Sequence, residues 1–161
     1  MQRSFCVGCF VLFAAMAVAA QENTPKAELF GGYQFAYGDG LKLNGWNTSI
    51  TGNISRSFGI TADFAGVYNG GHVYSYMFGP VVSARGRHVT PFLHALFGGA
   101  TGAGPAGGST VFSMAFGGGI DANAGNHLAF RIIQGDWWVL RSNGTFDKNS
   151  ARLSTGLVLR F

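Results

Sequence analysis

The side chains in this sequence that could take part in catalysis or metal binding are few and scattered. The four histidines are His72, His88, His94 and His127. They lie in separate segments, without the close spacing of metal ligands. Both cysteines, Cys6 and Cys9, lie near the start of the chain. We therefore expect no metal site.

One glycine-rich stretch, GAGPAGG, matches the pattern G-x-G-x-x-G at Gly102, Gly104 and Gly107. A dinucleotide site needs this pattern between a parallel strand and a helix. Here the following segment, STVFSMAFG, alternates like a strand, and Pro105 lies inside the match. We interpret the stretch as a surface loop and expect no cofactor.

Residues 1–20 have the pattern of a secretory signal peptide. Arg3 precedes an apolar stretch from Phe5 to Val18, and small residues follow up to Ala20. A retained membrane anchor is the alternative, but a spanning helix needs about 20 apolar residues, and this stretch is shorter. Cleavage after Ala20 removes both cysteines, so residues 21–161 form a mature domain without disulfides or thiolate chemistry.

The composition excludes several classes of protein. Charged residues make up 11% and aromatic residues 14%, with 26 glycines and no collagen period. This composition argues against disorder and against a collagen-like protein. The formal net charge of +4 is small and scattered, so we expect no nucleic-acid partner.

Apolar and polar residues alternate along about eight segments of the mature chain, which predicts β-strands. In WNTSITGNI, for example, Trp46, Ile50 and Ile54 share one face, opposite Asn47 and Ser49. No sustained helical period is present. The predicted connections are short turns at 55–57, 85–88 and 122–126, and mostly longer loops at 38–45, 69–72, 100–108 and 141–149.

The segment HLAFRIIQGDWWVL breaks the alternation, since Gln134 and Asp136 fall in the apolar phase. We predict a β-bulge near Ile132 and Ile133 that turns Gln134 and Asp136 inward, and Trp137 and Val139 outward. Alternatively, the strand simply leaves the apolar zone by Gln134.

Such strands could build a soluble sandwich, a lipocalin-like barrel or a membrane barrel. About a quarter of a typical soluble chain is charged, whereas the polar faces here carry mainly Ser, Thr, Asn, Gly and Ala. We therefore predict an eight-stranded antiparallel transmembrane barrel, with apolar faces toward lipid and a narrow, filled lumen. The predicted interface aromatics, at strand ends, are Tyr37, Trp46, Tyr68 and Tyr74.

The predicted lumen network comprises Glu28, Asp63, His94, Arg131, Gln134, Asp136, Arg152 and Arg160. Unpaired charges in a narrow interior are costly. Because the first and last strands are neighbours in a closed barrel, we expect Glu28 to pair with Arg160 near the periplasmic rim. Asp63 and Asp136 should pair with Arg131 or Arg152.

Together, the leader, the amphipathic strands and the final strand RLSTGLVLRF resemble small bacterial outer-membrane barrels of the OmpA/OmpX type. The resemblance covers essentially all of the mature chain. Leu157, Leu159 and Phe161 are similar to the C-terminal signal that the barrel-assembly machinery reads in that family. The resemblance implies an outer-membrane protein with periplasmic termini and membrane lipid as a partner. Since the chain stops at Phe161, we expect no peptidoglycan-binding domain.

We expect a monomer with a structural or surface-interaction role and no catalysis. A small pore or solute conduit is the main alternative. A soluble lipid-binding barrel and a lipid A-modifying enzyme are more remote. Lipid A deacylases of similar size use a His-x-Ser pair, but Tyr74, Thr90, Leu96 and Ala129 occupy the second position after each histidine here.

Overall fold

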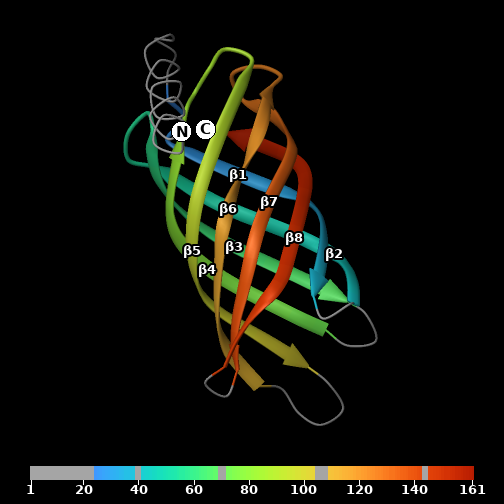
Figure 1. Ribbon diagram of the computed structural model, residues 1–161. Helices are drawn as coiled ribbons and strands as arrows, with labels where there is room; N and C mark the ends of the chain where they lie inside the picture. The colour runs from blue at the N-terminus through green and yellow to red at the C-terminus, as the bar shows by residue number, and fades with distance from the viewer. Residues whose placement is uncertain (1–23, 39–40, 69–71, 104–108, 143–144) are drawn as a thin grey trace, which may run out of the picture.

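Eight antiparallel strands close into one barrel in the computed structural model (Figure 1). The structure describes residues 24–38, 41–68, 72–103, 109–142 and 145–161, so the predicted leader lies outside it. The strands are β1 (Ala27–Gly38), β2 (Leu41–Asn53), β3 (Phe58–Tyr68), β4 (His72–Ser83), β5 (Val89–Ala103), β6 (Ser109–Asn123), β7 (Leu128–Ser142) and β8 (Thr145–Arg160). Each strand pairs with the next, and β8 closes against β1. None of the described residues belongs to a helix able to span a membrane.

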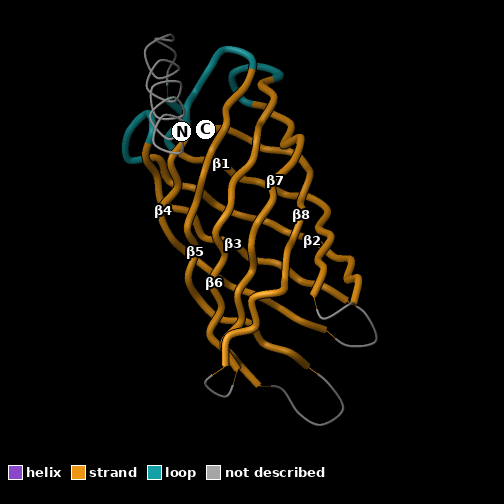
Figure 2. The backbone as a smooth tube through the Cα atoms, in the orientation of Figure 1, coloured by secondary structure: helices purple, strands orange, loops and turns teal. Residues whose placement is uncertain are grey.

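The barrel has two distinct ends. The turns 54–57, 84–88 and 124–127 lie at the same end as Phe161 (Figure 2). Backbone bonds tie this end together, since Lys26 N donates to Phe161 O at 2.6 Å and Ser83 N donates to Ser57 O at 2.8 Å. We call it the terminus end. The opposite end, where β1 ends and β2 begins, is the loop end.

The closing register sets which side chains face the lumen. Glu28 lies opposite Arg160, and Leu29 opposite Leu159. Residues opposite one another share a face. The first pair is buried in the lumen, and the second is exposed on the outer wall. Every strand presents large apolar side chains outward, including Tyr33, Ile50, Ile60, Phe78, Leu93, Phe112, Phe130 and Leu157. The outer wall is therefore apolar, as in barrels that face lipid.

Strand β7 contains the irregularity predicted from its sequence. Ile120 of β6 pairs with Ile133, but the next residue, Asp121, pairs with Arg131, so Ile132 is the extra residue of a bulge. Ile132 and Ile133 are both exposed, while Gln134 and Asp136 are buried. The bulge therefore turns the two polar side chains into the lumen, as expected from the phase break.

The second half of β7 follows the predicted phase with one difference. Trp137 is exposed and Trp138 is buried. Val139 pairs with Met114 in the outward phase, yet its side chain is buried rather than exposed. The β7–β8 pairing shifts again between Trp138 and Leu140.

The strands at the loop end are longer than the sequence indicated. Segments 38–45, 100–108 and 141–149 were predicted as loops, but strand pairing continues to Gly38, Ala103 and Ser142 and resumes at Leu41, Ser109 and Thr145. The loop prediction was therefore wrong for the described residues of these segments, whereas residues 39–40, 69–71, 104–108 and 143–144 of the predicted loops lie outside the part that the structure describes. The Gly, Asn and Asp content of the described residues favours turns, but the neighbouring strand satisfies their backbone groups, so pairing overrides composition.

Candidate functional site in the barrel lumen

The innermost charged cluster is centred on Arg152 of β8. Its Nη1 donates to Asp63 Oδ1 at 2.9 Å, and its Nε donates to Asp136 Oδ2 at 2.8 Å. All three side chains are almost completely buried. Asn47 Nδ2 also donates to Asp63 Oδ2 at 2.8 Å. One guanidinium thus joins β3, β7 and β8 across the lumen and neutralises two carboxylates.

His94 completes this cluster through Asp136. Its Nε2 lies 2.7 Å from Asp136 Oδ1. The two residues lie on β5 and β7, on either side of Gly117 of β6. A Cβ atom at Gly117 would lie 2.3 Å from Asp136 Oδ1 and 2.2 Å from Gly135 O. The missing side chain at position 117 therefore creates the space for the histidine–aspartate contact.

A second cluster surrounds Arg131 of β7. Arg131 Nε donates to Asp121 Oδ1 at 2.8 Å and Nη2 donates to Asp121 Oδ2 at 3.2 Å, a two-point contact that suits the planar guanidinium. Phe30 and Phe92 both pack against its guanidinium, with ring centroids 4.3 and 4.2 Å from Cζ. These contacts fix both the direction and the plane of the buried cation.

Gln134 links the two clusters. It accepts a hydrogen bond from Arg131 Nη1 at 2.6 Å and donates from Nε2 to Asp136 Oδ2 at 2.9 Å. The amide therefore matches a donor on one side and an acceptor on the other. Because the β7 bulge turns Gln134 inward, the bulge is what connects the two clusters.

The third cluster lies nearest the terminus end. Arg85 Nη1 donates to Glu28 Oε1, and Arg160 Nε lies 3.5 Å from the same oxygen. Arg160 Nη1 also donates to Asn123 Oδ1 at 2.7 Å. This cluster covers the lumen where the barrel opens toward the turns.

The structure places all eight residues of the predicted network in the lumen. Glu28 lies beside Arg160, and both Asp63 and Asp136 pair with Arg152. The partner of Arg131 is instead Asp121, which the sequence analysis did not include. Arg85 was also missed, because its segment reads as a turn. The lumen position of Asp121 could have been predicted, because alternation along its strand places it on the same face as Ser113.

The loop-end half of the lumen is apolar, which corrects the expectation of a polar interior throughout. Its buried cluster consists of Ala36, Val67, Met77, Leu96, Ala100, Ala115 and Trp138. Leu43, Val73, Val111 and Leu140 pack against it. Trp138 Nε1 donates to Ser113 Oγ at 2.7 Å, so its one polar atom is satisfied. In a barrel of eight strands the interior is just wide enough for its own side chains, and here they fill it.

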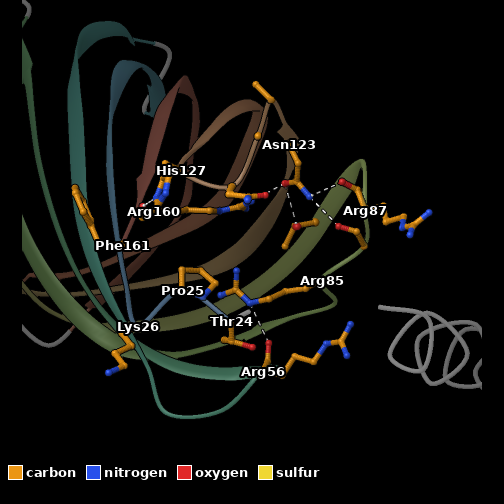
Figure 3. A pocket seen from close by; sticks show the side chains of 15 residues that line it. Thr24, Pro25, Lys26, Arg56, Arg85, Arg87, Asn123, His127, Arg160 and Phe161 are labelled. Carbon is orange, nitrogen blue, oxygen red and sulfur yellow. Dashed lines mark hydrogen bonds between the residues drawn. The ribbon is translucent and has the colours of Figure 1, made fainter. Parts of the chain in front are cut away.

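One small space lies inside the described barrel and a larger one lies at its mouth. A cavity of about 20 Å³ lies among the charged clusters, next to Asp63, His94 and Arg131. Its size is that of about one water molecule. A basin of about 960 Å³ lies at the terminus end (Figure 3). Neither space is lined by a residue of the buried apolar cluster.

The four predicted interface aromatics all face outward near the loop end. Tyr37, Trp46, Tyr68 and Tyr74 are exposed. Trp46 Nε1 donates to Tyr68 Oη at 3.0 Å, and the rings of Tyr68 and Tyr74 meet edge to face with centroids 6.2 Å apart. An exposed aromatic cluster with polar tips suits the boundary between lipid and headgroups.

The C-terminal side chains of the predicted assembly signal are exposed. Leu157, Leu159 and Phe161 are all exposed, the last with 67% of its surface accessible.

The histidines remain apart in the structure. The described residues contain no group of three His, Cys, Asp or Glu side chains able to hold a metal ion. The pair of His94 and Asp136 has the geometry of a base and its orienting carboxylate, but among the described residues no Ser or Thr hydroxyl bonds to His94. The pair is also closed off beneath the third cluster.

Comparison with known proteins identifies the fold. No family model and no curated protein sequence matches the chain. Among solved structures, the N-terminal β-barrel domain of OprF from Pseudomonas aeruginosa matches with a TM-score of 0.63 and 10% identity, covering 86% of this chain and 100% of that one.

Two further structures agree. Neisserial surface protein A matches with a TM-score of 0.61 and 13% identity, over 84% of this chain and 96% of that one. Ail, the attachment invasion locus protein of Yersinia pestis, matches with a TM-score of 0.55 and 18% identity, over 86% and 100%. At these identities the likeness concerns the fold, which is that of the small OmpA/OmpX-type barrels.

Proposed function

We propose that this chain, which has the fold of the small outer-membrane barrels, is an integral outer-membrane protein that conducts no solute. Its role is structural or surface-interactive, and it catalyses no reaction. The observation that carries the proposal is the combination of an apolar outer wall with a lumen filled by two different layers. An apolar wall suits lipid, and a lumen occupied by side chains supports a closed barrel over a pore.

Conductance in a planar bilayer tests the closed lumen. The purified protein should give no unitary current steps above the lipid baseline, while a larger porin in the same bilayer serves as the positive control. Reproducible steps from the unmodified protein would establish the pore alternative and overturn this part of the proposal.

Membrane fractionation tests the location. The protein should sediment with outer membranes and migrate faster on gels before heating than after it, since a closed barrel resists detergent until heated. Recovery in the periplasm alone would contradict the proposal.

Lipid A mass spectrometry tests the absence of catalysis. The lipid A of a deletion strain should give an unchanged spectrum, and an altered spectrum would indicate a lipid-modifying enzyme.

We place both termini on the periplasmic side, with the loop end outside the cell. An even number of strands puts both ends of the chain together. The closed barrel leaves no free edge strand in the described ladder, which supports a monomer. Cysteine substitutions at Arg87 and at Lys42, labelled on intact cells with a membrane-impermeant maleimide, should react at position 42 alone.

The C-terminal side chains Leu157, Leu159 and Phe161 are proposed to be read by the barrel-assembly machinery. Their exposure supports this proposal, because exposed side chains are accessible to a partner. Phe161→Ala should lower the amount of folded protein in cells at least threefold, yet leave refolding in detergent unchanged. Leu153→Ala, on the same outer face of β8, is the matched control. A refolding defect equal to the cellular one would argue for stability rather than recognition.

A further inference from the structure

The basin at the terminus end is strongly basic. Its lining includes Lys26, Arg56, Arg85, Arg87 and Arg160, and no Asp or Glu side chain belongs to the described lining. Figure 3 shows Arg85 and Arg160 reaching over the mouth from opposite walls, whereas Arg56 and Arg87 extend to a common side beyond it. Five cationic side chains thus line one open space of about 960 Å³.

The two carboxylates that contact the basin arginines, Glu28 and Asp121, do not balance these five charges. Glu28 is buried and already contacts both Arg85 and Arg160. Lys26, Arg56 and Arg87 make no ion pair with any described carboxylate, and Lys26 and Arg87 are exposed. Like charges gathered around a concave surface focus a positive potential into it, which attracts anions from solution.

The arginines outside the pair with Glu28 are held on braced turns. Arg85 Nε donates to Arg56 O at 3.0 Å, which joins the turn after β2 to the turn after β4. Asn123 Nδ2 donates to Gly86 O at 2.8 Å and to Arg87 O at 3.2 Å, which joins the second turn to the end of β6. The backbone that carries Arg56 and Arg87 is therefore positioned before any ligand arrives.

The basin opens along the barrel axis, within the mouth, whereas lipid contacts the outer wall. An anion that reaches it must therefore come from the aqueous side. Arginine recognises phosphate oxygens through paired N–H donors, and several arginines together favour an anion with several charged groups.

We propose that the basin binds a soluble anion bearing several phosphate groups. Arg56, Arg87 and Lys26 supply its charge contacts, and Arg85 with Arg160 supplies the positive floor. Lys26, Arg56 and Arg87 make no ion pair with the described lumen carboxylates, so only the floor of the site is shared with the third cluster.

Calorimetric titration of the purified protein with sodium tripolyphosphate in a zwitterionic detergent tests this site. At 150 mM salt the titration should be saturable with one ligand per barrel. The double variant Arg56→Gln/Arg87→Gln should bind at least tenfold more weakly. The control Lys42→Gln/Arg141→Gln removes the same charge at the loop end and should change the affinity less than twofold. Unchanged heat-modifiable migration should show that each variant is folded.

Three results would overturn the proposal. The first is the absence of saturable binding to the folded protein. The second is an equal loss of affinity in both double variants, which would show a diffuse effect of net charge. The third is tripolyphosphate binding that is present in phosphatidylcholine nanodiscs but absent, at 150 mM salt, in nanodiscs that contain phosphatidylglycerol. That result would mean that lipid phosphates occupy the basin.

Discussion

The two halves of the lumen are filled by opposite kinds of side chain on the same wall of alternating strands. Toward the terminus end, four arginines and four carboxylates form linked ion pairs centred on Arg152, Arg131 and Glu28. Toward the loop end, Leu96, Met77 and Trp138 form a dry core. Both halves close the barrel, but by different physics. The charged half depends on each partner being present, whereas the apolar half depends on volume.

The largest expected effect is in the charged half. Arg152→Ala leaves two buried carboxylates without their cation, and breaking a buried pair in this way costs about 3–5 kcal/mol. Urea unfolding in detergent, followed by tryptophan fluorescence, measures the loss. The triple variant Asp63→Asn/Asp136→Asn/Arg152→Met removes all the charges together and should recover most of that stability. A loss below about 1 kcal/mol in the single variant would show that the ion pairs do not govern this half.

The apolar half should respond to lost volume. Leu96→Ala removes a fully buried side chain from the loop-end cluster and should cost about 3 kcal/mol in the same assay. Leu93→Ala, on the same strand but on the outer wall, is the control and should cost less than about 1 kcal/mol. Equal losses at the two positions would mean that the loop-end core is not tightly packed.

Substitution of Gly117 tests whether the space beside this residue is needed for the His94–Asp136 contact. Gly117→Ala places a Cβ atom against Asp136 and the backbone of Gly135, and should cost about 2 kcal/mol. Gly31→Ala is the matched control, because a Cβ there meets nothing within 4 Å. It should be neutral within about 0.5 kcal/mol. If the two alanine variants unfold at the same urea concentration, the space above Gly117 is not what admits the His94–Asp136 contact.

The smallest effect should come from the aromatic faces around Arg131. Phe30→Leu keeps an apolar side chain but removes one ring from the cation, at a cost of about 1 kcal/mol. Phe78→Leu, a ring on the outer wall with 64% exposure, controls for the loss of a phenyl group. Adding Phe92→Leu should roughly double the loss if the two rings act separately.

Much of this arrangement could be predicted from the sequence, because alternation alone assigns each side chain to the lumen or to the outer wall. The phase break at Gln134 and Asp136 located the bulge for the same reason. The sequence does not predict which carboxylate pairs with which arginine. That pairing depends on the stagger between strands, which brings Asp121 next to Arg131. Arg85 was missed because a turn residue has no alternating phase. The apolar core was missed because Leu96 and Met77 stand singly between outward neighbours, so neither segment looks unusual.

One of the two ion pairs of Arg152 connects strands that are not neighbours in the barrel wall. Its partner Asp63 lies on β3, and in the wall β1 and β2 separate β3 from β8. A ladder can form one strand at a time, but this bond cannot exist while the last strand is undocked. The stabilisation it provides is therefore withheld from every partly assembled sheet and becomes available in a single step at closure. Such a barrel should close cooperatively, because a partly assembled sheet lacks the stabilisation that the closed barrel has.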